Sequence, residues 1–207
     1  MIERRALERI QRDLKRYDES REKVLELSRV VTRLSGWSII QTHRKEMKKA
    51  AATLREAERS LKQMATALQR YPELKGSGSI RVAEQEYAEA RCLHALVAGH
   101  GLPGIAKVGV ESSSYLLGLL DMIGELRRLA LNYLRNGRGA EAERTLVTME
   151  DLYEDLLSLD HTAIIPTFRN KVDGVRRVIE STRGDVVTEI RRLSLEKAIR
   201  SLERRVR

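Results

Sequence analysis

The stretch Tyr115-Leu-Leu-Gly-Leu-Leu-Asp-Met-Ile-Gly-Glu-Leu-Arg-Arg128 decides the fold and marks a place where charge is costly. Its apolar residues fall on nearly every side of a helix, and such a helix is normally buried. Asp121 and Glu125 interrupt it four residues apart, so a helix places both carboxylates on one face. Because an isolated buried charge is very unfavourable, these carboxylates must be paired, protonated or bound to a metal.

A second acidic pair lies upstream. Glu86 and Glu89 are three residues apart in Glu84-Gln-Glu-Tyr-Ala-Glu-Ala90, a spacing that also puts both on one helix face. Two acidic pairs on neighbouring helices predict a divalent-metal site. Carboxylate oxygens are hard ligands, which suit Mg²⁺ or Mn²⁺.

Each acidic pair also has a simpler interpretation. Glu86 and Glu89 would face solvent if their helix is amphipathic and lies at the surface. Arg127 and Arg128 would pair with the acids of the second stretch, which would then be structural ion pairs. The spacing alone leaves both the metal site and these structural roles open.

Composition predicts an all-α protein of one domain over residues 1–207. Only 4% of the 207 residues are aromatic and three are proline, while alanine, leucine and long charged residues dominate. No apolar run approaches the roughly 18 residues of a membrane span, and no signal peptide precedes the first helix. Cys92 is the only cysteine, which excludes a disulfide framework and a cysteine zinc site. We therefore expect a reducing, cytoplasmic location and no membrane partner.

Apolar periodicity predicts seven helices. Their ranges are 3–34, about 37–71, 79–97, about 115–136, about 139–158, about 163–182 and 185 onward, the last fraying over about 200–207. Gly36 and Trp37 indicate a bend, and Arg183-Gly184-Asp185 indicates a break with Asp185 as the next cap. Asn136-Gly137 is a typical helix stop. Residues 99–114 are expected to form a loop, with Ser112 to Ser114 capping the next helix.

The formal net charge of +9 favours a polyanionic partner, and nucleic acid is the usual one. The alternative is that these charges only solvate helix surfaces. The scarcity of aromatic residues argues against a base-stacking sheet of the RRM type.

Two motifs are discounted. Gly99-His-Gly-Leu-Pro-Gly104 matches the dinucleotide fingerprint in letters, but a helix precedes it where a strand is required. A ferritin-like di-iron centre needs Glu-x-x-His motifs, and no histidine follows Glu86 or Glu89 at that spacing.

Three segments, in order, resemble the translin superfamily. The stretch from Tyr115 to Asn132, followed by Asn136-Gly137, is similar to its signature helix. The segment Arg21 to Ser35, leading to His43-Arg44, resembles the first-helix region. Phe168-Arg-Asn-Lys-Val-Asp-Gly-Val-Arg-Arg-Val-Ile-Glu180 resembles the helix that contains Lys-x-Asp-Gly. The resemblance covers nearly the whole chain and implies a seven-helix bundle that oligomerises.

Within that superfamily, the acidic residues are similar to those of the translin-associated factor X-like branch. Its motif is Glu-x-x-Glu followed by Asp-x-x-Gly-Glu, and this chain has Glu86-Tyr-Ala-Glu89 and Asp121-Met-Ile-Gly-Glu125. The resemblance implies an Mg²⁺- or Mn²⁺-dependent endoribonuclease acting on single-stranded RNA, with these four carboxylates as metal ligands and catalytic residues. Arg81, Arg127 and Arg128 are candidate phosphate contacts.

The resemblance also implies partners. Superfamily members form closed, hollow octamers whose nucleic-acid site faces inward, so a homo-octamer around single-stranded RNA or DNA is expected here. The alternative is a non-catalytic, translin-like scaffold that binds the same nucleic acids. A purely structural helical oligomer is the third possibility, in which the basic charge is only solvated surface.

Overall fold

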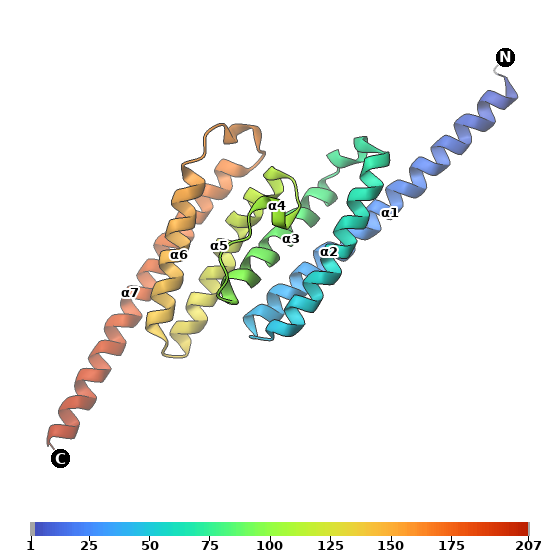
Figure 1. The fold of residues 1–207 in the computed structure, drawn as a ribbon. Helices are drawn as coiled ribbons and strands as arrows, with labels where there is room; N and C mark the ends of the chain where they lie inside the picture. The colour runs from blue at the N-terminus through green and yellow to red at the C-terminus, as the bar shows by residue number, and fades with distance from the viewer. Residues whose placement is uncertain (1–2, 207) are drawn as a thin grey trace. The chain divides into compact units, whose positions relative to one another are not determined.

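The structure is a computed structural model that describes residues 3–206, and within that range every regular element is helical (Figure 1). The α-helices found there are α1 (Arg4–His43), α2 (Met47–Arg70), α3 (Gly78–Val97), α4 (Ile105–Val108), α5 (Ser112–Arg135), α6 (Gly139–Leu157) and α7 (Phe168–Val206). Two short 3-10 turns join them, η1 (Pro72–Gly76) and η2 (Thr162–Ile164). The all-α prediction is confirmed.

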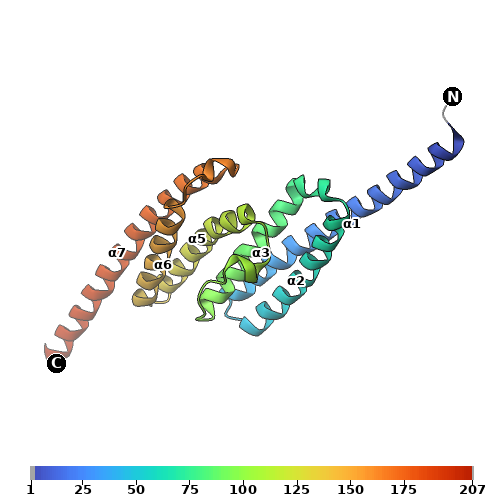
Figure 2. The ribbon, with the colours of Figure 1, turned by 45° about the horizontal axis from the view of Figure 1, so that its top comes forward.

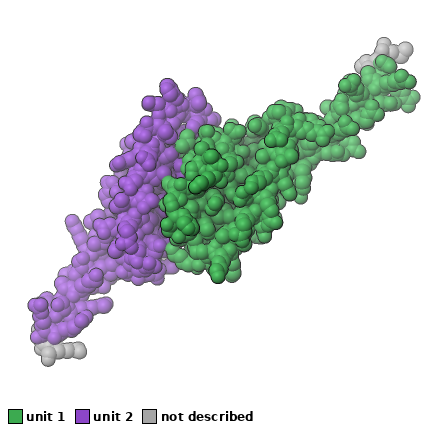
Figure 3. Space-filling view, in the orientation of Figure 1, with its two compact units in different colours: residues 1–118 green, residues 119–207 purple. Residues whose placement is uncertain are grey.

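The chain divides into two compact units, Met1–Gly118 and Leu119–Arg207 (Figure 3). Helix α5 contributes its first residues to unit 1 and the rest to unit 2. The prediction of one domain over residues 1–207 stays a prediction.

Unit 1 is built around α1, which packs against both α2 and α3 (Figures 1 and 2). Its core is apolar, and Val31, Met64, Tyr87 and Leu93 are almost completely buried. The first turns of α1 extend beyond α2 and α3, and their apolar side chains are exposed. The ring of Tyr17 packs edge-on against Tyr71 at 5.4 Å, and the buried residues of α1 begin at Val24.

Unit 2 is built around the pairing of α6 with α7. Met149 on α6 and Ile179 and Val186 on α7 are buried. The last turns of α7 extend beyond α6, where Leu195 and Leu202 are exposed. The helix continues to Val206, and the predicted fraying over about 200–207 stays a prediction.

The predicted bend at Gly36 and Trp37 is wrong, because α1 passes through both residues and ends at His43. A helical glycine costs about 1 kcal/mol relative to alanine, which is less than the burial of the apolar residues around it contributes. Leu34 and Ile39 are buried on either side of Gly36. The chain turns instead at Lys45, whose φ is +62°, while Glu46 N–H donates to Gln41 O at 2.9 Å. This left-handed stop is usually a glycine, so its sequence signal is weak here.

The predicted break at Arg183-Gly184-Asp185 is also wrong, because α7 is continuous there. Thr182 and Val186 are buried on both sides of Gly184, so packing again outweighs the cost of glycine. Asp185 lies within the helix and forms an ion pair at 3.1 Å with Arg127 rather than capping a new helix.

The stop at Asn136-Gly137 is confirmed. Gly137 has a φ of +69° and donates to Leu134 O, and Arg138 N–H donates to Tyr133 O. Part of the expected loop 99–114 forms the short α4, which Gly109 closes with a φ of +74°. None of the described helices is long and apolar enough to cross a membrane.

Candidate functional site

The first acidic pair lies on α3 in unit 1. Glu89 is only 7% exposed, and among the described residues 3–206 it is the one charged residue that is buried. Glu86, one turn earlier, is half-buried. The prediction that these residues simply face solvent is therefore wrong for Glu89. A carboxylate at such a place is stable only where hydrogen bonds or a cation offset its lost hydration.

Glu89 lies beside the closest approach of α5 to α3. A Cβ atom added at Gly118 on α5 would lie 2.6 Å from Gln85 O and 3.1 Å from Glu89 N. Those distances leave no room for a side chain at residue 118, so only glycine lets the two backbones meet there. Gly118 thus fixes where α5 crosses α3, next to the buried acid.

The second acidic pair follows Gly118 along the same helix. Asp121 is one turn beyond Gly118, Glu125 is one further turn along, and their side chains are 29% and 24% exposed. Met122 and Ile123, two of the three residues between them, are completely buried, whereas Gly124 is exposed. Both acids consequently lie at the edge of an apolar core rather than in open solvent.

Each acid of the second pair has a basic partner inside unit 2. Lys171 on α7 donates a hydrogen bond to Asp121 Oδ1, and the two form a half-buried ion pair. Arg128 lies 3.6 Å from Glu125 and is itself well exposed. Lys171 belongs to the Lys-x-Asp-Gly segment noted in the sequence, but its pairing with a residue fifty positions earlier has no local sequence signal.

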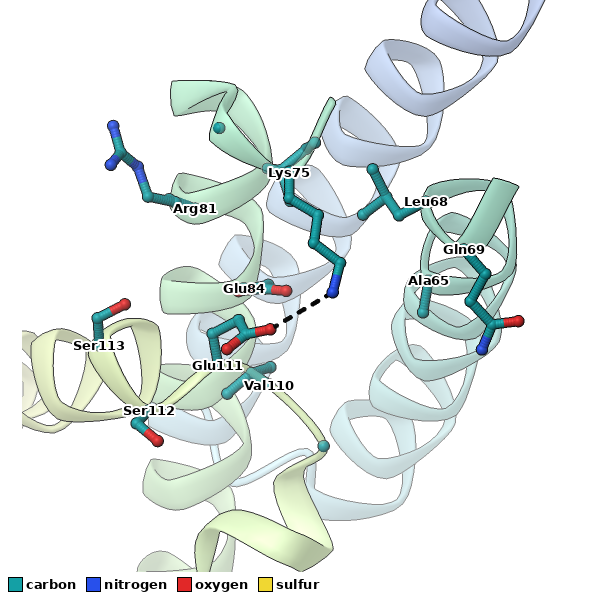
Figure 4. A pocket seen from close by; sticks show the side chains of 13 residues that line it. Ala65, Leu68, Gln69, Lys75, Arg81, Glu84, Val110, Glu111, Ser112 and Ser113 are labelled. Atoms are coloured by element: carbon teal, nitrogen blue, oxygen red, sulfur yellow. Dashed lines mark ion pairs between the residues drawn. The ribbon is translucent and has the colours of Figure 1, made fainter. Parts of the chain in front are cut away.

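The three candidate arginines lie in different environments. Arg127 is engaged in unit 2, where its guanidinium donates to Thr182 Oγ1 at 2.7 Å and to Asp185 at 3.1 Å. It therefore holds α5 against α7. Arg128 and Arg81 are exposed, and Arg81 extends from α3 beside a cleft of unit 1 (Figure 4).

The sequence analysis overlooked Glu84, which lines that cleft from α3. Ser114 Oγ donates to Glu84 Oε2 at 2.9 Å, and the backbone N–H of Glu111 donates to the same carboxyl. Burial raises the pKa of Glu84 above its ordinary value, and the two hydrogen bonds only partly oppose that effect. The neighbouring Glu86 and Glu89 suggested a stripe on the other side of α3, so Glu84 gave no separate signal.

The four predicted ligands fit a hard divalent cation in their chemistry, since all of them offer carboxylate oxygens. Within either unit taken by itself, residues 3–206 bring no three acidic, histidine or cysteine side chains together around a possible ion. Glu86 and Glu89 belong to unit 1, whereas Asp121 and Glu125 belong to unit 2. The set of four thus stays a prediction.

Comparison with protein families matches residues 4–181 to the model of the translin family. The chain belongs to the translin family. An uncharacterized protein of Methanocaldococcus jannaschii is 34% identical over 188 residues, which cover 90% of this chain and 83% of that protein.

Solved structures agree with the family. AfC3PO in complex with duplex RNA is 30% identical, with a TM-score of 0.81, and the match covers 89% of this chain and 96% of that one. Apo-NeC3PO has a TM-score of 0.82 over 91% of this chain and 98% of its own, and at 24% identity it supports the fold alone. The prediction of a translin-like bundle is confirmed, whereas the position of the chain within the family is a separate question.

Proposed function

We propose that this protein is a metal-dependent endoribonuclease of the translin-associated factor X-like branch, which cleaves single-stranded RNA. The observation that carries the proposal is the burial of Glu89 where α5 crosses α3 at Gly118. The Asp-x-x-Gly-Glu motif begins one turn beyond that crossing. The complex of the related AfC3PO with duplex RNA supports RNA as the ligand class.

Glu86, Glu89, Asp121 and Glu125 would hold Mg²⁺ or Mn²⁺. When bound, such an ion lowers the pKa of a bound water and neutralises charge that develops on the phosphate. One of the four carboxylates would accept the proton of the attacking water, a role that requires hydrogen-bond contact with that water.

Three basic residues would complete the chemistry. Lys171 donates to Asp121 Oδ1, and a cation bound by Asp121 would compete with that contact. The freed ammonium group would then be available to a phosphate oxygen of the RNA. Arg128, exposed one turn after Glu125, offers a second phosphate contact, as does Arg81 on α3. Such contacts position a strand without reading its bases, so cleavage would have weak sequence preference.

We further infer that the protein works as a homo-oligomer, an octamer by resemblance. The two protruding helix ends support this, because each carries an exposed apolar stripe at helical spacing. The stripes consist of Leu7, Ile10 and Leu14 on α1 and Leu195, Ile199 and Leu202 on α7. An octamer would have a mass about eight times 23.7 kDa, which light scattering measures directly. Eight copies would also multiply the charge of +9 around a bound strand and make binding strongly salt-dependent.

The decisive experiment incubates the purified protein with labelled single-stranded RNA in Mg²⁺, in Mn²⁺ and in EDTA. Glu89→Gln and Asp121→Asn are run alongside, with Glu143→Gln on the exposed face of α6 as a control of equal charge change. We expect cleavage that requires the metal, is retained in the control and falls by at least about 100-fold in both site variants. Loss of a residue that only supports a ligand already costs about 10–100-fold.

A non-catalytic, translin-like scaffold that binds single-stranded RNA or DNA is the second candidate function. The ion pairs of Asp121 with Lys171 and of Glu125 with Arg128 favour it, because they give both acids a structural role. Binding of RNA at low salt with no cleavage under any metal condition would establish this scaffold and overturn the nuclease.

A further inference from the structure

Unit 1 contains a cleft of about 590 Å³ between α2 and α3, closed at one end by the segment that leads into α5 (Figure 4). Small-molecule sites commonly have volumes of about 300–1,000 Å³ and combine apolar walls with a few polar groups. Leu68, Ile80 and Val110 supply apolar surface here, while Gln69 and Glu84 supply polar groups. The cleft thus has the size and the lining of a ligand site.

Glu84 is fixed in the wall of this cleft by two neutral donors. The Ser114 hydroxyl and the Glu111 N–H both donate to its carboxyl, which sets the orientation of that group. An ionised carboxylate has about four acceptor positions, so two donors leave room for hydrogen bonds from a ligand.

A loose ion pair spans the cleft beside Glu84. Lys75 Nζ lies 3.9 Å from Glu111 Oε1, and the two side chains are 57% and 67% exposed. Figure 4 shows them reaching toward each other with Glu84 close behind. An exposed pair at that distance contributes little stability, so an incoming ligand can separate the two at small cost. Lys75 would then be available to an anionic group of the ligand.

The cleft lies a short way along α3 from the proposed cutting site. Glu84 precedes Glu89 by five residues on α3, which corresponds to about 7.5 Å along the helix axis. Five residues also make one full turn plus about 140°, so the two side chains leave α3 on different sides. The cleft would therefore receive a base of a strand that bends around α3, rather than the base next to the cut.

We propose that this cleft is a base-binding subsite for one adenine, cytosine or guanine of the RNA strand, a base that donates its exocyclic amino group to Glu84. The proposal rests on the proposed function, since it assigns the subsite to the RNA that the nuclease would bind. Leu68 and Ile80 would contact the faces of the base, and Lys75 the adjoining phosphate. Uracil has no amino group and would present a carbonyl oxygen to the carboxylate, so it is disfavoured. A carboxylate that accepts from a base amino group is an established mode of base recognition.

The test measures binding rather than cleavage. AMP, CMP, GMP, UMP and inorganic phosphate are titrated separately into the full-length protein without added metal, and binding is followed by amide chemical shifts or calorimetry. We expect the three amino-bearing nucleotides to bind about 10-fold more tightly than UMP, the lower end of discrimination by a good polar contact to a base. Phosphate alone should bind more weakly than any of the three.

Glu84→Gln is the matched variant, because it keeps the shape of the side chain and adds an amide donor. It should abolish the preference, since the new NH₂ group can donate to uracil. Glu56→Gln on the exposed face of α2 makes the same charge change and should retain the preference. If Glu84→Gln does not fold, the selectivity of the wild-type protein and the shifts of the Leu68 and Ile80 amides still decide the matter.

Three outcomes overturn the subsite: equal affinity for all four nucleotides, affinity no greater than that of phosphate, or no binding at millimolar concentration. An unchanged preference for amino-bearing nucleotides in Glu84→Gln also overturns the subsite.

The experiments distinguish failure of the nuclease from failure of the subsite. Selective binding without metal-dependent cleavage overturns the nuclease and leaves a base site on a scaffold, whereas cleavage without selectivity overturns the subsite.

Discussion

Asp121 in unit 2 and Glu84 in unit 1 are both half-buried carboxylates, but they are stabilised in different ways. Asp121 is paired with the ammonium group of Lys171, whereas Glu84 is held by the hydroxyl of Ser114 and a backbone N–H. A cationic partner favours the charged form, and neutral donors offset only part of the cost of burial. Burial alone therefore does not identify a functional carboxylate. The partner of the carboxylate decides which ligand the carboxylate can accept.

The same helix positions both acids. Ser114, which holds Glu84, lies one turn before Gly118, and Asp121 lies nearly one turn after it. The close approach of α5 to α3 at Gly118 therefore sets the position of Ser114, the partner of Glu84, within unit 1. A change at this glycine should disturb Ser114 and the backbone of Glu89 together.

The largest effect is expected from Gly118→Ala. Its Cβ would lie 2.6 Å from Gln85 O, a backbone atom that cannot move without shifting α3. Overpacking of this kind costs about 1–3 kcal/mol of unfolding free energy, which chemical denaturation measures. Both nucleotide binding in the cleft and RNA cleavage should weaken.

Gly124→Ala on the same helix is the control. Nothing lies within 4 Å of a Cβ at Gly124, so alanine there should stabilise the helix by about 0.5–1 kcal/mol. An equal effect of the two substitutions would show that the crossing at Gly118 does not hold the acids in place.

The next largest effect is expected from Lys171→Met, which removes the cationic partner of Asp121. It leaves a half-buried carboxylate without its ammonium group. Loss of one partner of a fully buried pair costs about 3–5 kcal/mol, and partial exposure of this pair reduces the cost to about 1–2 kcal/mol. Urea denaturation measures this loss.

Cleavage kinetics separate the two roles of Lys171. A structural ion pair predicts that activity, corrected for the folded fraction, is unchanged in Lys171→Met. Contact with the RNA phosphate predicts a lower kcat/KM that added salt does not restore. Lys171→Arg retains the charge and serves as the matched control for the stability effect.

Local signals in the sequence were enough for most of the fold and for part of the site. Apolar periodicity and the glycine stop at Gly137 predicted α3, α6 and the end of α5 within one residue, because those helices end where local chemistry requires it. Helix α5 begins at Ser112, three residues before the predicted start, so Ser112 to Ser114 lie in the helix rather than ahead of it. The stop at Lys45 was missed because the left-handed residue is not glycine, and the break at Gly184 was predicted wrongly because tertiary packing outweighs it. Local patterns thus fail where long-range contacts determine the backbone.

The same reasoning applies to the acids. The i, i+3 and i, i+4 spacings identified all four predicted ligands, since a spacing is visible in the sequence alone. Lys171 and Glu84 had no comparable signal, because their partners lie fifty and thirty residues away. The structure was needed to find the partner of each acid, and with it the contrast between Asp121 and Glu84.

A smaller effect is expected from Ser114→Ala, which removes a neutral partner of Glu84. One hydrogen bond to a partly buried carboxylate is worth about 1 kcal/mol, and the Glu111 N–H remains in place. Because the Ser114 hydroxyl lowers the pKa of Glu84, its loss should raise that pKa further. An NMR titration of the Glu84 carboxyl measures the shift, and Ser113→Ala, whose hydroxyl is not bonded to Glu84, is the control. No change in the titration would mean that the Ser114 hydroxyl does not affect the pKa of Glu84.

The smallest effect is the pH dependence of stability that Glu84 contributes. Its pKa in the folded state is above the unfolded value, so the folded state binds more protons over the interval between the two. The contribution of Glu84 is therefore fully favourable below the unfolded pKa, near 4.5, and is lost as pH rises through the folded pKa. Glu84→Gln does not ionise, so we expect the Tm of the variant to rise relative to that of the wild type as pH increases above about 4.5. Glu56→Gln on the exposed face of α2 makes the same charge change and is the control. A Tm difference between Glu84→Gln and the wild type that stays constant with pH would contradict this prediction.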